Sequence, residues 1–291
     1  MVSLLKQLVH KVCQPYISMP ETKAVLSIGS VSYAIVDEYS DVDIAIYYDE
    51  LPSEEALAQA MRTNGAENLN WCLGDREEGG IVESYYVYGV ECQFAHTTLA
   101  AMERDMNSVL VDLDVATPLQ KALSGVLAGE PIIGEDLIRQ FKARASDYPH
   151  ALRVAMVNKF FNFQPWWALE ARLAVRDTKL WRSQAMMEGA QNLLGTLAGL
   201  NRLYYSTFQF KRMSAFIDHM SLKPKDLEKR LLIVIEGGTE APLMLRELVS
   251  ETGDLVEEHL PEASTVAARR ALARTEHKWD AAVLAKSLGE N

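Results

Sequence analysis

Apolar and polar positions follow two different patterns along the chain. In the first part, short apolar runs alternate with polar residues, which is typical of strands. The alternation is clearest over 41–46, where the even positions are apolar and the odd positions include Asp41 and Asp43. After about residue 115, apolar residues instead recur at helical spacing. This change predicts two domains, 1–115 and 116–291.

The first domain is expected to contain a small mixed sheet with helices on one face. Helices are expected over 1–10, 53–64 and 99–105. Ser53 is the expected N-cap of the second helix, and Thr97 or Thr98 that of the third. The expected strands are 24–28, 41–46, 68–73, 81–88 and 90–96.

The second domain is expected to be almost entirely helical. Long amphipathic segments with short connections are typical of an antiparallel bundle. The expected helices are 117–127, 135–145, 149–176, 180–206, 211–220, 225–236, 240–259 and 263–288. The fold class predicted for the whole chain is therefore α+β, a small mixed sheet followed by an α-helical bundle.

Composition limits the classes of function. The net charge of −11 argues against a broad nucleic-acid-binding surface and is compatible with a cationic small-molecule substrate. The chain has 3 cysteines, without metal-type spacing or a disulfide pattern, which suits a reducing cytosol. No apolar stretch approaches the roughly 20 residues of a membrane span. Because 1–10 resembles an amphipathic helix rather than a signal peptide, a cytoplasmic location is expected.

The odd positions of 41–46 carry the candidate chemistry. Asp41 and Asp43 lie about 6.5–7 Å apart along one face of the expected strand. Two carboxylates at that spacing can hold Mg²⁺, which prefers one or two carboxylates together with substrate phosphate oxygens. Upstream, Gly29 and Ser30 follow the strand 24–28 and offer backbone N–H groups, a hydroxyl and no bulky side chain. These features suit a phosphate group lying close to the chain.

In this order, the strand, the Gly29–Ser30 pair and the second strand with Asp41 and Asp43 resemble the signature of the DNA polymerase beta-type nucleotidyltransferase superfamily. The resemblance covers roughly residues 24–96 and departs in the loop at Tyr33. It implies a third carboxylate on a neighbouring strand. Glu91 is the expected residue, acting as metal ligand or as general base. Its rivals are Glu83, Asp112 and Asp114.

A catalytic domain followed by a helical bundle also resembles the bacterial nucleotidyltransferases that act on aminoglycoside or lincosamide antibiotics. That resemblance implies transfer of a nucleoside monophosphate, AMP from ATP in the first instance, to a hydroxyl of a small molecule with release of pyrophosphate. ATP or another nucleoside triphosphate, Mg²⁺ and a hydroxylated small-molecule acceptor are the implied partners. Neither nucleic acid nor a membrane is expected, and paired clefts in the resembled enzymes allow a homodimer.

The bundle supplies further candidates. Lys211 and Arg176 are expected on the triphosphate. Asp177 is expected on the acceptor, with Glu188 as a further carboxylate for a cationic group. Trp181 offers a flat surface for a base or a sugar ring. Each also has an ordinary structural interpretation, because charged residues commonly form a solvated helix face and aromatic residues at helical spacing commonly belong to the core.

Two other functions remain open. The chain could nucleotidylate a protein or an RNA, as members of toxin–antitoxin pairs with this minimal domain do, although the acidic charge speaks against RNA. It could also be a nucleotide-binding module without turnover. A structure in which Glu91 turns away from the aspartate pair, with no other carboxylate in reach, would favour that last possibility.

Overall fold

The structure of the protein is a computed structural model that describes residues 1–275 and 278–289. The chain forms two compact units, Met1–Leu152 and Arg153–Asn291. The division lies after Leu152 rather than after residue 115. The reason is that the segment after residue 115 packs on the sheet of the first unit, where α5 (Leu119–Ala128) and α6 (Glu135–Ser146) contact the strand that precedes Gly29.

The described strands of the first unit form one six-stranded sheet in the order β3-β4-β5-β2-β1-β6. The strands β2 and β5 run parallel and every other neighbouring pair is antiparallel, so the sheet is mixed. The α+β fold class is confirmed. The bounds of the strands are β1 Thr22–Ile28, β2 Val42–Tyr48, β3 Trp71–Asp75, β4 Gly80–Val87, β5 Val90–Thr98 and β6 Glu130–Ile133.

Five strands match the sequence expectation and one was missed. No strand is expected from the sequence at 130–133, because Gly129 and Pro131 flank Glu130 and both residues commonly break regular structure. It forms the short edge strand β6 against β1. An edge position tolerates Pro131 because the side of an edge strand that faces away from the sheet needs no backbone donor.

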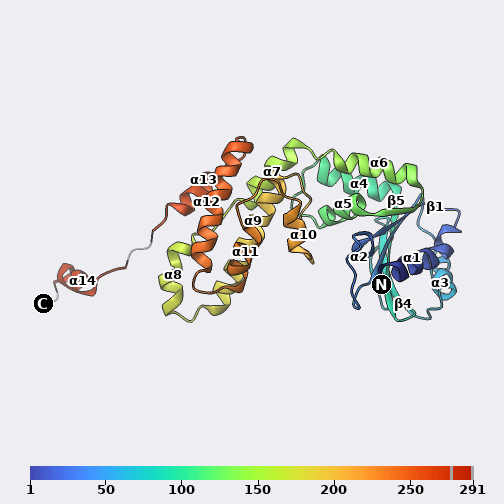
Figure 1. Cartoon of the computed structure of the whole chain (residues 1–291), viewed down its shortest axis with the longest axis horizontal. Coiled ribbons are helices and arrows are strands. Elements are labelled where there is room, and N and C mark those ends of the chain that lie inside the picture. The colour runs from blue at the N-terminus through green and yellow to red at the C-terminus, as the bar shows by residue number, and fades with distance from the viewer. Residues whose placement is uncertain (276–277, 290–291) are drawn as a thin grey trace. The chain divides into compact units, whose positions relative to one another are not determined.

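Helices cover both faces of the sheet, whereas the sequence predicted helices on one face. The first face packs under α1 (Val2–Ile17) and α3 (Glu54–Thr63), and its core includes Val12 of α1 and Ile44 of β2. On the second face, the rings of Tyr47 and Phe141 lie 5.1 Å apart. Figure 1 shows α4 (Leu99–Leu110), α5 and α6 grouped along one side of the sheet, away from α1 and α3.

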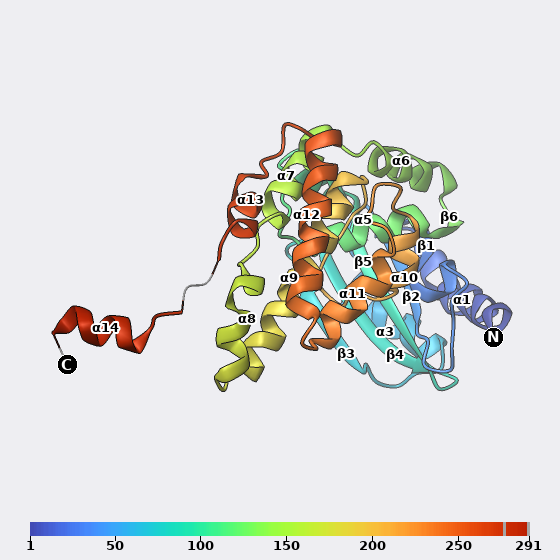
Figure 2. The same cartoon turned by 60° about the vertical axis from the view of Figure 1, so that its left-hand side comes forward.

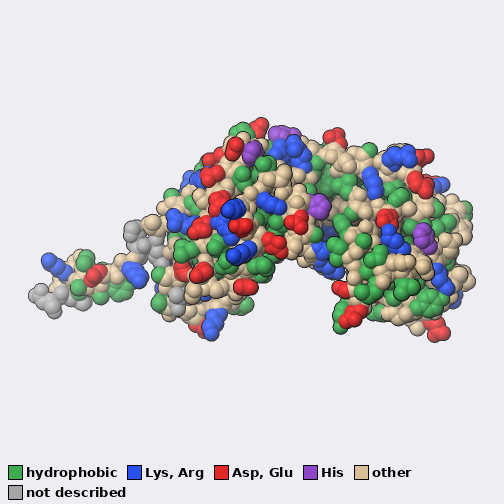
Figure 3. Space-filling view, in the orientation of Figure 1, with side chains coloured by type: hydrophobic (Ala, Val, Ile, Leu, Met, Phe, Trp, Pro, Cys, Tyr) green, Lys and Arg blue, Asp and Glu red, His purple; other side chains and the backbone are tan. Residues whose placement is uncertain are grey.

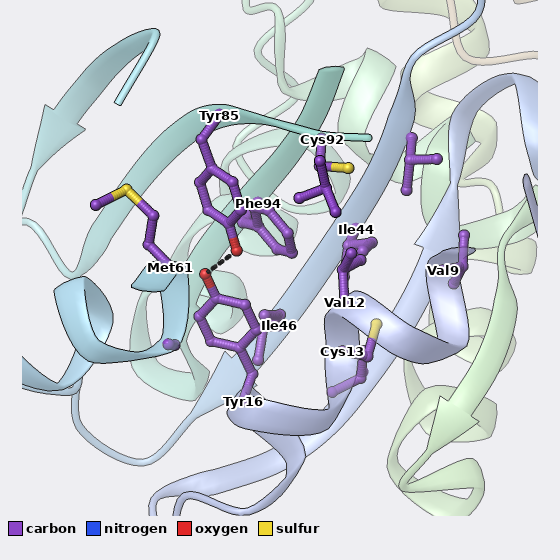
Figure 4. Packing of buried hydrophobic residues seen from close by; sticks show 14 of the residues in the cluster. Val9, Val12, Cys13, Tyr16, Ile44, Ile46, Met61, Tyr85, Cys92 and Phe94 are labelled. Carbon is purple, nitrogen blue, oxygen red and sulfur yellow. Dashed lines mark hydrogen bonds between the residues drawn. The ribbon is translucent and has the colours of Figure 1, made fainter. Parts of the chain in front are cut away.

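The core under α1 contains a buried polar network. The hydroxyl groups of Tyr16 and Tyr85 lie 2.9 Å apart (Figure 4), and Tyr16 donates a 3.1 Å hydrogen bond to Glu83. On the other side, Nε2 of His96 lies 3.2 Å from Glu83 and Nδ1 lies 2.9 Å from the hydroxyl of Tyr48. Glu83 and His96 are 5% and 0% exposed, so the hydroxyl groups of Tyr16 and Tyr48 replace water as their hydrogen-bonding partners, whereas Nε2 of His96 approaches Glu83 without a hydrogen bond.

Two expected caps of the first unit are confirmed. Ser53 accepts a hydrogen bond from the backbone N–H of Ala56 and begins α3. Thr98 does the same for Ala101 and begins α4 directly after β5. A hydroxyl oxygen at the N-cap satisfies a backbone donor that has no partner within the helix. The short connection from β5 to α4 follows from this cap.

The second unit is helical in all its described regular elements. The helices α9, α11 and α12 contact one another and lie side by side in Figures 1 and 2. The helix bounds are α7 His150–Phe160, α8 Trp166–Val175, α9 Lys179–Leu200, α10 Met213–Asp218, α11 Leu227–Glu236, α12 Ala241–His259, α13 Val266–Leu272 and α14 Ala281–Leu288.

Three expected helices of this unit end or break earlier than predicted. The segment 149–176 is divided after Phe160, because Pro165 lacks the backbone donor that a continuous helix needs. The segment 180–206 ends at Leu200. The segment 263–288 forms α13 and α14 with irregular chain between them, and residues 276 and 277 lie outside the described residues.

Charged side chains of both signs mix on the surface of the helical unit. Figure 3 shows Lys and Arg side chains beside Asp and Glu side chains on its visible face. On α13, Arg269 contacts both Asp254 and Glu257 of α12, and on α11 Arg230 contacts Glu251. Among the helices that the structure describes, none is long and apolar enough to cross a membrane.

Candidate functional site

The aspartate pair lies where β1 and β2 meet the turn between them. Asp43 pairs with Ile28, the last residue of β1, and Asp41 directly precedes β2. The residues after Ile28 form the short helix α2 (Gly29–Ser32). Val42 is fully buried on the core face, so alternation along β2 places Asp41 and Asp43 together on the opposite face, where both are half-buried.

Gly29 lies against the carboxylate of Asp43. A Cβ atom on Gly29 would lie 1.9 Å from Oδ2 of Asp43, and Gly29 has a φ of +69°. The contact leaves no room for a side chain unless Asp43 moves, and the left-handed backbone conformation adds strain for any residue other than glycine. Ser30, 6% exposed, donates a 3.3 Å hydrogen bond to the backbone carbonyl of Asp41. The Gly29–Ser30 pair and the aspartate pair therefore lie against each other.

Gln93 is the neighbour on the other side of β2. It pairs with Asp43 across the parallel strands β2 and β5, and its Nε2 donates a 2.9 Å hydrogen bond to Oδ2 of Asp41. Gln93 thus contacts one aspartate through its side chain and the other through strand register. Gln93 was not among the residues predicted for the site. Alternation along the strand does indicate that residue 93 lies on the same face as residue 91. The pairing register of β5 with β2, which brings Gln93 to Asp41, depends on the tertiary structure and is not indicated by the local sequence.

Glu91 is on the same face of β5 as Gln93, and its side chain accepts hydrogen bonds from the side of β3 and β4. Its Oε1 accepts hydrogen bonds from Ser84 (2.6 Å), Trp71 (2.9 Å) and Asn70 (3.1 Å). The hydrogen bond from Ser84, together with those from Trp71 and Asn70, holds the pKa of Glu91 below its ordinary value, although burial works in the opposite direction. Glu91 is therefore an anion with three donors at neutral pH.

The rivals of Glu91 lie elsewhere. Glu83 is buried in the network on the opposite face of the sheet. Asp112 and Asp114 are exposed in the segment after α4. Within residues 1–275 and 278–289, no group of three or more His, Cys, Asp and Glu residues is arranged to hold a metal ion. The acidic side chains that the site offers side by side are the two aspartates.

The bundle candidates all lie in the helical unit. Lys211 is exposed in the chain before α10, and Arg176 and Asp177 are exposed after α8. Trp181 lies in the first turns of α9, and its ring is 5.3 Å from that of Trp166 at 82°. Trp181 lines a cavity together with Glu188. The roles of these residues toward a triphosphate or an acceptor stay predictions.

No protein-family model and no curated protein sequence matches the chain. Among solved structures, the chain is similar to a nucleotidyltransferase-like protein from Exiguobacterium sibiricum 255-15. The two sequences are 14% identical, the match covers 89% of this chain and 80% of that chain, and the TM-score is 0.35. At this identity and TM-score, the likeness assigns neither a family nor an activity to the chain.

Proposed function

We propose that the protein is a nucleotidyltransferase that moves a nucleoside monophosphate, AMP from ATP in the first instance, to a hydroxyl group of a small molecule. The observation that carries the proposal is the contact between Gly29 and the carboxylate of Asp43, with Asp41 on the same face of the sheet. A phosphate group needs close approach to backbone N–H groups, and the divalent cation that accompanies it needs carboxylates. One site offers both.

Magnesium fits this site as a partner of the substrate rather than as a resident ion. Among the described residues, no third acid is grouped with the two carboxylates, and two are too few for a closed protein cage. Mg²⁺ commonly binds one or two carboxylates, with substrate phosphates completing the shell. Asp41 and Asp43 would hold the ion. When bound, it would offset the negative charge of the triphosphate.

The residues of the chain would act by positioning. Backbone N–H groups at Gly29 and Ser30 would bind the β- and γ-phosphates. The acceptor oxygen would attack the α-phosphorus, forming the new P–O bond as the bond to pyrophosphate breaks, and the hydroxyl proton would pass to a base. Glu91 remains the proposed base or additional metal ligand. Its three donors lower its pKa and make it a weaker base than an unpartnered glutamate.

In the helical unit, Lys211 and Arg176 are proposed contacts of the triphosphate. Asp177 and Trp181 are proposed contacts of the acceptor. An antibiotic is one class of acceptor that this proposal includes. None of these four residues belongs to the Gly29–Asp43 site, by which we mean Gly29, Ser30, Asp41 and Asp43. Each can therefore be substituted without changing the groups on which the main proposal depends.

The test separates nucleotide binding from turnover. The protein would be titrated with ATP in Mg²⁺ and in EDTA, and then incubated with α-labelled ATP and a panel of hydroxylated small molecules while pyrophosphate release is followed. Asp41→Asn and Asp43→Asn should each abolish Mg²⁺-dependent binding and transfer and keep the fold. Asp112→Asn, an exposed acid outside the site, is the matched control. Unchanged binding and turnover in both site variants would refute the proposal.

A second candidate function is a nucleotide-binding module without turnover. The hydrogen bonds of Glu91 to Asn70, Trp71 and Ser84, and the missing three-residue metal cluster among the described residues, favour it. Mg²⁺-dependent ATP binding that needs Asp41, without pyrophosphate release for any small molecule, protein or RNA acceptor, would select this candidate. A labelled protein or RNA product would instead select the macromolecular acceptor.

A further inference from the structure

A cavity of about 310 Å³ lies in the helical unit, beside the start of α8 and the first half of α9. From α9 it is lined by Trp181, Gln184 and Glu188, which are three and seven residues apart and so share one helix face. From α8 it is lined by Trp166 and Leu169. The volume is at the lower end of the range for small-molecule sites. It suits a ligand the size of one substituted ring.

Two indole rings form the apolar part of this cavity. Their centroids are 5.3 Å apart and their planes meet at 82°, so the rings stand nearly at right angles. Trp166 is 6% exposed and held in the core, whereas Trp181 is 47% exposed although it packs on Trp166. One anchored ring and one accessible ring give a ligand a rigid apolar corner, because neither indole has many rotamers to lose on binding.

The charge of the cavity is that of one carboxylate. Glu188 is the single ionisable residue among the described residues that line it. In the part of the chain that the structure describes, Glu188 is exposed and forms no ion pair or hydrogen bond, although other surface acids of this unit, such as Glu251 and Glu257, contact arginines. Two groups of the cavity therefore attract a cation. The carboxylate of Glu188 acts through its charge, and the indole rings act through their negative faces.

We infer that this cavity binds a small organic cation whose ammonium group is attached to an apolar or aromatic body. Glu188 would face the ammonium group, Gln184 would offer an amide oxygen, and Trp166 and Trp181 would contact the body. The inference stands on the cavity alone and does not depend on nucleotidyl transfer at the Gly29–Asp43 site. A neutral ligand would gain only the indole contacts, and an anion would be repelled by Glu188.

The experiment compares two probes that differ in charge but little in size, phenethylammonium and 2-phenylethanol. Titrations of the full chain are followed by the indole N–H signals of its 5 tryptophans, which are assigned by single Trp→Phe variants. The cation is expected to move the signals of Trp166 and Trp181 and to bind with a dissociation constant on the order of 1 mM. The alcohol is expected to bind about threefold more weakly.

Two variants test the separate parts of the cavity. Glu188→Gln keeps size and should remove the preference for the cation, while Trp181→Leu should weaken both probes. Glu236→Gln removes the same charge from an exposed position of α11 and should leave the preference intact. Equal binding of the two probes by the unaltered protein would overturn the inference. So would signal changes confined to Trp71, Trp167 or Trp279, or a preference that survives Glu188→Gln.

Discussion

The side-chain amide of Gln93 donates a 2.9 Å hydrogen bond to Oδ2 of Asp41. Gln93 lies in β5 and Asp41 lies directly before β2. The two residues are 52 positions apart in sequence, and the parallel pairing of β2 with β5 brings them together. The bond fixes one carboxylate of the pair from the neighbouring strand. It also places an amide, rather than a third acid, beside the aspartates.

If Gln93 positions Asp41, removing its amide should weaken the site. Gln93→Leu is expected to reduce Mg²⁺-dependent ATP binding by about 10- to 100-fold, as removal of the partners of metal ligands commonly does. Isothermal titration with ATP, with and without Mg²⁺, measures this loss. Gln93→Asn, which keeps the amide on a shorter side chain, should restore part of the affinity. A Gln93→Leu variant that binds normally would show that Asp41 needs no support from β5.

An acid at position 93 should make the site respond to metal in a different way. Gln93→Glu sets a third carboxylate against Asp41, and like charges at this distance repel one another unless a cation separates them. The variant is therefore expected to melt at a lower temperature in EDTA and to gain more from added Mg²⁺ than the unaltered protein does. Gln140→Glu adds the same charge to an exposed position of α6 and should show no such gain. Equal Mg²⁺ responses of the two variants would contradict the prediction.

Gly29→Ala should disturb Asp43 directly. The added Cβ would lie 1.9 Å from Oδ2 of Asp43, and the φ of +69° costs an alanine about 1–2 kcal/mol. Gly89→Ala is the matched control, because Gly89 has a φ of +82° and its Cβ would have no neighbour within 4 Å. Urea unfolding should show a similar backbone cost in both. Only Gly29→Ala is expected to lose ATP binding as well. Loss of ATP binding in both variants would mean that backbone strain, rather than the contact with Asp43, causes the effect.

Glu91 should make stability depend on pH in the acid range. Its pKa in the folded protein lies below the ordinary value of a glutamate, chiefly through the hydrogen bond from Ser84. Its ionised form therefore stabilises the fold fully above that ordinary value, and this stabilisation is lost as pH falls through the lowered folded pKa. Urea unfolding between pH 7 and pH 3 should show the difference between the unaltered protein and Glu91→Gln shrinking as pH falls. A difference between the two proteins that stays constant over this pH range would contradict the prediction.

The buried network should matter more to stability than a surface ion pair of shorter distance. Glu83→Ala removes the partner of both Tyr16 and His96 in the core and is expected to cost about 3 kcal/mol or more. Asp49→Ala removes the 2.6 Å ion pair with Lys23 on the surface, where the Lys23 side chain is 39% exposed and the Asp49 side chain 59% exposed. This loss should cost less than about 1 kcal/mol. Denaturant unfolding of the two variants decides the order. A loss of unfolding free energy in Glu83→Ala no larger than that in Asp49→Ala would contradict the prediction.

Local patterns were enough to predict much of the first unit. Alternation predicted β2 and β5, and the hydroxyl residues Ser53 and Thr98 predicted the starts of α3 and α4. These predictions succeed because side-chain direction along a strand and capping at a helix end depend on neighbours within a few residues. The edge strand β6 was not predictable in this way, because its pairing with β1 compensates for a sequence that contains Pro131.

Strand periodicity alone is enough to place Asp41 and Asp43 on one face of a strand that follows the Gly29–Ser30 pair. Which residues lie beside the two aspartates depends on how the whole first unit folds. The parallel register of β2 and β5 brings Gln93 to Asp41, while the hydrogen bonds of Glu91 go to Ser84 and the neighbouring strands. The physical reason is that strand periodicity is local, whereas the register between distant strands depends on how their apolar faces pack into one core.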